Sequence, residues 1–215
     1  MSAHNRILQE RRKARRAAMA EPKVNKFALF GETVLLGVTL FVLALPVVTA
    51  PAAYAAGAAH MERHLAGRPD TVLSLWSDFR AALPGSWKFG FGALAAGAIA
   101  AVNLLLAASG QLPGGTGVLI ATAALAAGLA VLLLRTAVLW QIKRADAGRT
   151  AAGVWAGAWA QAKTEAVGDV AGTALLLAAM AMSVTFVWML PPLVFIVPGV
   201  MVLAVVAVRY RTISK

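Results

Sequence analysis

Two histidines and a glutamate lie close together in the stretch HMERH, residues 60–64. His60 and His64 are four residues apart, which places both side chains on one helix face at a spacing that metal ligands use. The metalloprotease pattern needs a glutamate directly after the first histidine, and here Glu62 comes second. We therefore interpret the pair as a polar junction that meets lipid headgroups, and we expect no metal-ligating residue.

Other patterns that carry catalysis are missing from the sequence. The chain has no cysteine, which excludes disulfides and thiolate chemistry. The stretch GSWK at 85–88 lacks the leading glycine and the spacing of a phosphate-binding loop. Gly-x-Ser-x-Gly, the nucleophile elbow of many hydrolases, does not occur. We expect no catalytic residue, no cofactor-binding residue and no cofactor, and we do not expect an enzyme.

A few polar residues interrupt the apolar segments. Glu32, Arg135 and Asp169 are charged, and charges at membrane depth are candidates for function. We predict that Arg135 forms a structural ion pair with either Glu32 or Asp169. Asn103 lies deep in another apolar segment, where a helix-to-helix hydrogen bond is worth about 0.6 kcal/mol on average.

Composition identifies the class of protein. Of the 215 residues, 60% are hydrophobic and only 13% are charged, whereas roughly a quarter of the residues of a soluble domain are charged. A spanning helix needs about 20 apolar residues, which predicts an integral membrane protein. The apolar segments are 27–61, 89–109, 117–140, 170–189 and 193–208.

The distribution of basic residues predicts the topology. Residues 1–26 hold eight Lys and Arg, and residues 62–88, 141–167 and 209–215 together hold eleven. Because basic residues stay on the cytoplasmic side, all these segments are cytoplasmic only if the first apolar segment enters the membrane and returns. We therefore expect cytoplasmic N- and C-termini and a basic tail that lies against anionic lipid rather than nucleic acid.

The expected fold is an all-α polytopic membrane bundle of three helical hairpins, about six membrane segments in one domain at 27–210. The tails are 1–26 and 211–215, the hairpins are about 27–62, 89–140 and 169–209, and interfacial helices occupy about 71–84 and 150–166. Pro46 and Pro51 break the first segment. Its return leg, 51–61, rises only about 17 Å as a helix, so this leg is short or re-entrant.

The two interfacial helices carry tryptophans. In the first, Leu75, Trp76, Phe79, Ala82 and Leu83 share an apolar face, with Asp78 and Arg80 off it. In the second, Trp155 and Trp159 are four residues apart and therefore neighbours on one side. We interpret these aromatic side chains as the belt at the membrane interface.

The chain resembles the YesL-type bacterial membrane proteins. The resemblance lies in FVLALPVVTAPAAYAA (41–56), LAGRPDTVLSLWSDFRAALPGSWKFG (65–90) and the closing hairpin. Leu45, Pro46 and Thr49 match a Leu-Pro-x-x-Thr motif, whereas Ala50-Pro51 stands where Gly-Pro is frequent. The resemblance implies a multi-pass protein of the cell membrane with no established activity, often associated with genes for carbohydrate uptake.

Three functions are compatible with these observations. The first is a non-enzymatic accessory protein whose partners are the lipid bilayer, subunits of a sugar importer or a second copy of the chain. The second is a small membrane transporter in its own right, although few polar side chains lie in the apolar segments to hold a substrate. The third is a membrane enzyme with His60, Glu62 and His64 as its only candidate site.

Overall fold

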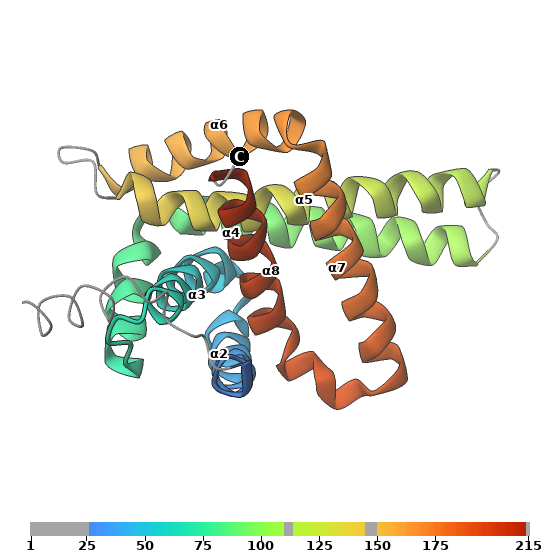
Figure 1. Cartoon of the computed structure of the whole chain (residues 1–215). Coiled ribbons are helices and arrows are strands. Elements are labelled where there is room, and N and C mark those ends of the chain that lie inside the picture. The colour runs from blue at the N-terminus through green and yellow to red at the C-terminus, as the bar shows by residue number, and fades with distance from the viewer. Residues whose placement is uncertain (1–25, 110–113, 145–149, 214–215) are drawn as a thin grey trace, which may run out of the picture.

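The computed structural model describes residues 26–109, 114–144 and 150–213, and these residues form helices joined by turns, without strands (Figure 1). The basic tail at residues 1–25 and the last two residues lie outside the described part. The elements are α2 (Lys26–Ala44), η1 (Val47–Thr49), α3 (Ala50–Leu65), α4 (Val72–Ala108), α5 (Gly115–Lys143), α6 (Ala151–Gly168), α7 (Val170–Met189), η2 (Pro191–Phe195) and α8 (Val197–Ile213).

The first apolar segment is divided into α2 and α3 by two prolines. Pro46 precedes the short helix η1, and Pro51 lies in the first turn of α3, where a missing amide proton costs no helical hydrogen bond. Glu32 near the start of α2 contacts His60 near the end of α3. The two helices therefore lie against each other in opposite directions.

Helix α3 forms the centre of the core. Ten of its sixteen residues are buried, and it packs against α2, α4, α5 and α8. Most of the buried residues are alanines, whose small side chains let neighbouring helices approach closely. The alanine-rich stretch therefore lets α3 pack closely against several helices at once.

Helix α4 bends between its amphipathic and apolar parts. Pro84 has ψ 121° and Gly85 has φ 87°, both outside the helical region. Only glycine adopts such a positive φ without strain, and proline cannot complete the hydrogen-bond ladder. Thr71 caps the start of the helix in a capping box with Ser74. The break falls where the sequence separates the predicted interfacial helix from the following span.

Among the described residues, three helices are long and apolar enough to cross a membrane, namely α4, α5 and α7. The apolar part of α2, Leu29–Ala44, is shorter. In Figure 1, α4 and α5 lie side by side and extend beyond the other helices, while α2 is seen nearly along its axis and α3 obliquely. The axes of α4 and α5 therefore cross the axes of α2 and α3 and do not run parallel to them.

The belt interpretation of Trp155 is wrong. Its side chain is 1% exposed and its Nε1 donates a hydrogen bond to the carbonyl of Ala82, at 3.0 Å. Its ring stacks on Trp140, with the centroids 5.6 Å apart, and also contacts Phe89. Trp155 therefore holds α6 against α4 and α5. Trp76, by contrast, is 48% exposed and remains available to an interface.

Candidate functional site

The ion pairs of the described residues gather at one set of helix ends. Ion pairs join the beginning of α2, the ends of α3, α5 and α8, the first part of α4, and the junction of α6 with α7. They are Glu32–His60, His60–Asp70, His64–Asp70, Arg63–Asp78, Arg144–Asp78, Arg135–Glu165, Arg135–Asp169 and Arg211–Asp169. The opposite connections, η1 and η2, carry no charged residue.

His60 does not lie at the headgroups. Its side chain is 7% exposed, and its Nε2 lies 2.5 Å from Oε1 of Glu32. The predicted position at the headgroups is wrong because a buried imidazole needs a polar partner, and the antiparallel packing of α2 on α3 brings Glu32 to it. Glu32 therefore pairs with a histidine and not with Arg135.

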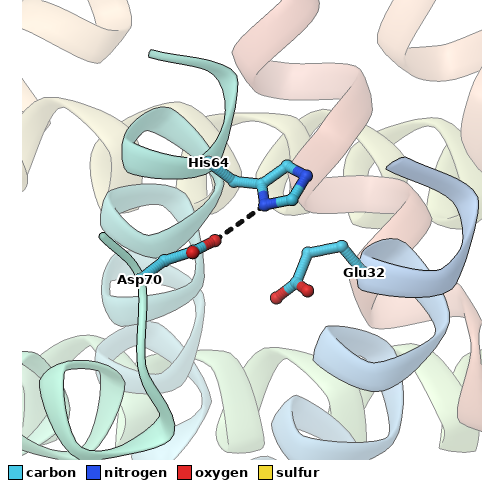
Figure 2. Close-up of side chains that lie close together, drawn as sticks. All are labelled: Glu32, His64 and Asp70. Atoms are coloured by element: carbon cyan, nitrogen blue, oxygen red, sulfur yellow. Dashed lines mark hydrogen bonds and ion pairs between the residues drawn. The ribbon is translucent and has the colours of Figure 1, made fainter. Parts of the chain in front are cut away.

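His64, Asp70 and Glu32 converge from three segments (Figure 2). His64 extends from α3, Asp70 from the connection to α4, and Glu32 from α2. Nδ1 of His64 lies 2.7 Å from Oδ2 of Asp70, and one ligand atom from each of the three side chains lies within 4.8 Å of the others. These side chains are 19–23% exposed, so solvent reaches the cluster.

A second polar cluster, centred on Asp78, was not predicted from the sequence. Asp78, expected to lie off the apolar face, is 5% exposed. Its carboxylate lies 2.7 Å from Arg63 Nη1 and 2.7 Å from Arg144 Nη1. A carboxylate is buried only when it is paired, and the two arginines supply the pairing. They link α3, α4 and the end of α5.

The predicted pair of Arg135 with Asp169 is confirmed. Nη2 of Arg135 donates to Oδ2 of Asp169 at 3.3 Å, and Nη2 of Arg211 donates to Oδ1 at 3.2 Å. Asp169 directly precedes α7 and accepts a hydrogen bond from the backbone N–H of Gly172 as its N-cap. That bond, together with Arg135 and Arg211, holds the pKa of Asp169 below its ordinary value.

The lowered pKa of Asp169 predicts a dependence of stability on pH. Its contribution is fully present above the ordinary aspartate pKa, about 4, and is lost as the pH falls through the lower folded value. In detergent, Asp169→Asn should lower the unfolding midpoint at pH 7. At pH 3, the difference in midpoint between this variant and the parent chain should be smaller. A difference that is equal at both pH values would contradict this assignment.

An apolar cavity of about 560 Å³ lies at the other end of α3. Its walls come from η1, α3, α4, α5, α7, η2 and α8, and its polar side chains are Tyr54, Ser183 and Trp188. The Ser183 hydroxyl donates to the carbonyl of Ala179. A volume of this size suits a small molecule, but the lining suits an apolar one.

A groove of about 420 Å³ runs between the projecting parts of α4 and α5. Asn103 and Thr122 lie along it. Most of the other lining residues are small, among them Ala93, Ala96, Gly97, Ala100, Ala126 and Ala130. Small residues with an intervening amide are typical of surfaces on which membrane helices associate.

Comparisons of the chain with protein families, curated proteins and solved structures find no match. The class of protein therefore comes from the fold and the composition. The part of the chain that the structure describes is all-helical and has three helices long and apolar enough to cross a bilayer. With 60% hydrophobic residues in the whole sequence, the chain is a helical integral membrane protein.

Sequence reasoning found some of these residues and missed others. The histidine pair, Glu32 and the Arg135 pair stood out because they interrupt apolar segments. Asp70 was missed because it lies in a polar connection where acidic residues are ordinary. Its only local signal is its position at the end of the turn after α3, six residues from His64.

Proposed function

We propose that this chain is a non-enzymatic accessory protein of the cell membrane that binds membrane helices of a partner. The observation that carries this proposal is the groove between α4 and α5, lined by small residues and Asn103. On the YesL-type resemblance, the partner is a subunit of a sugar importer, and the chain is of bacterial type.

The exposed surface around the groove supports this proposal. Ile99, Leu105 and Leu125 are 63–76% exposed on the projecting pair of helices. Lipid tails are as apolar as leucine, so apolar area alone does not drive helices together in a membrane. Close backbone approach and a shared hydrogen bond do, and the groove offers both through Gly97 and Asn103.

Co-purification from native membranes tests the proposal. A tagged parent chain in mild detergent should retain importer subunits, identified by mass spectrometry. Gly97→Leu should lose them, because the leucine fills the groove. An added Cβ at Gly97 meets no atom within 4 Å, so the fold should persist. Gly92→Leu is the matched control, since that site is also open but outside the groove. Equal recovery with both variants would refute the proposal.

The proposed topology keeps the ion-paired helix ends in the cytoplasm. In this arrangement α4 with α5 and α7 with α8 cross and return, α2 with α3 is re-entrant, and both termini are cytoplasmic. The absence of native cysteine allows single-cysteine labelling of intact cells. Ser109→Cys should react with an impermeant thiol reagent and Arg68→Cys only after lysis. The reverse labelling pattern would show that the ion-paired helix ends lie outside the cell, and it would refute this topology.

The apolar cavity favours a second candidate function, a small transporter. Its volume of about 560 Å³ is adequate for a substrate. Its lining favours an apolar substrate over a sugar, because sugar hydroxyls need hydrogen-bonding partners that this lining largely lacks. Protein-dependent uptake of a labelled apolar solute by liposomes that contain the purified chain would support this candidate over the accessory role.

A further inference from the structure

We propose that Glu32, His64 and Asp70 bind a divalent transition-metal ion such as Zn²⁺. One ligand atom from each lies within 4.8 Å of the other two, and Figure 2 shows the two carboxylates and the imidazole directed toward a common space. This site stands independently of the proposed partner, because it lies at the polar ends of α2 and α3 and not in the groove.

The donor set defines the class of metal. One imidazole nitrogen with two carboxylate oxygens suits first-row divalent ions such as Zn²⁺ and Mn²⁺. Three protein ligands leave a coordination position for water. A small cavity of about 90 Å³, lined by Glu32, His60 and Asp70 among others, adjoins the cluster. This cavity is large enough for that water molecule, because one water molecule occupies about 30 Å³ in the liquid.

His60 acts on the site through Glu32. Its Nε2 lies 2.5 Å from Glu32 Oε1, and its Nδ1 has no hydrogen-bond partner among the described residues. An Nε2–H that donates to Glu32 leaves only a lone pair unsatisfied at Nδ1. His60 is therefore a positioning residue, because a carboxylate that ligates a metal is usually oriented by such a hydrogen bond.

The ion would join three segments that are distant in the sequence. Glu32 belongs to α2, His64 to the last turn of α3, and Asp70 to the connection before α4. Two carboxylates close together repel each other, and a divalent cation removes that repulsion. Bound metal therefore ties the start of α2 to the α3–α4 connection and stabilises the folded chain by mass action.

Metal binding by the full chain tests the proposal. The protein is purified in detergent with an affinity tag free of histidine, stripped with EDTA and dialysed against ZnCl₂. We expect about one Zn²⁺ per chain and an unfolding midpoint raised by Zn²⁺ but not by Mg²⁺. His64→Ala and Asp70→Asn should each weaken Zn²⁺ binding by at least about tenfold. His60→Gln should weaken it less, because the glutamine amide still donates to Glu32.

Two variants control for adventitious binding. His4→Ala removes the third histidine of the chain, and Glu165→Gln removes a carboxylate of a different cluster. Both should bind Zn²⁺ as the parent chain does. Asp70→Asn is nearly isosteric, so it carries the test if His64→Ala fails to fold. No stoichiometric Zn²⁺, or equal binding by the parent chain and Asp70→Asn, would overturn the proposal and leave two histidine–carboxylate pairs.

Discussion

Asp78→Asn should lower the free energy of unfolding. Breaking a buried ion pair costs about 3–5 kcal/mol, and we expect a loss near the lower end of that range. The amide keeps the shape of the side chain but leaves Arg63 and Arg144 without their shared carboxylate, 2.7 Å from each. The loss stays near the lower end because the side chains of Arg63 and Arg144 are 21% and 41% exposed. Thermal unfolding in detergent measures the change.

Two comparisons isolate the cause of that loss. Replacing all three charges, as in Arg63→Met with Asp78→Leu and Arg144→Met, should recover most of the stability, because no charge is left unpaired. Glu165→Gln should change stability by less than about 1 kcal/mol, since the Glu165 side chain is 39% exposed. If Asp78→Asn unfolds at the parent temperature, the carboxylate does not link these helices.

Gly90→Ala should destabilise the protein by about 1–3 kcal/mol or more. A Cβ at Gly90 would overlap the backbone of Val48, including its carbonyl oxygen. Val48 lies in η1, and a main-chain carbonyl cannot rotate away as a flexible side chain can. The helix α4 and the turn between α2 and α3 would have to separate.

The same helix supplies the matched control for this prediction. Gly92 is two residues along α4, and a Cβ there meets no atom within 4 Å. Gly92→Ala should be neutral or stabilising by up to about 1 kcal/mol, because alanine is the better helix former. Both unfolding midpoints are measured in the same detergent. Equal midpoints for the two variants would show that α4 does not approach η1 this closely.

Close glycine contacts also occur where α2 and α8 cross. A Cβ at Gly199 would overlap the carbonyl oxygen of Thr33, and one at Gly37 would lie 2.9 Å from the backbone of Ile196. Glycine on both helices lets the two backbones approach, as at many membrane helix crossings. These contacts connect the first described helix to the last.

The sequence by itself determined the class of protein and most helix boundaries. Hydropathy and charge are local properties, so the apolar segment at 170–189 appears directly as α7, and the prolines at 46 and 51 mark the break between α2 and α3. The bend at Pro84 and Gly85 is local as well, because both residues disfavour a continuous helix. The start of α8 was predicted less accurately, because the apolar residues of η2 precede it without interruption.

Only the tertiary structure decided which charges meet and which aromatic side chains are buried. Asp78 and Arg144 are 66 residues apart, and Glu32 and His60 are 28 apart. Trp155 is covered because α6 packs on α4 and α5. Such contacts depend on how helices cross and pack against one another, and neither periodicity nor hydropathy within a helix specifies that arrangement.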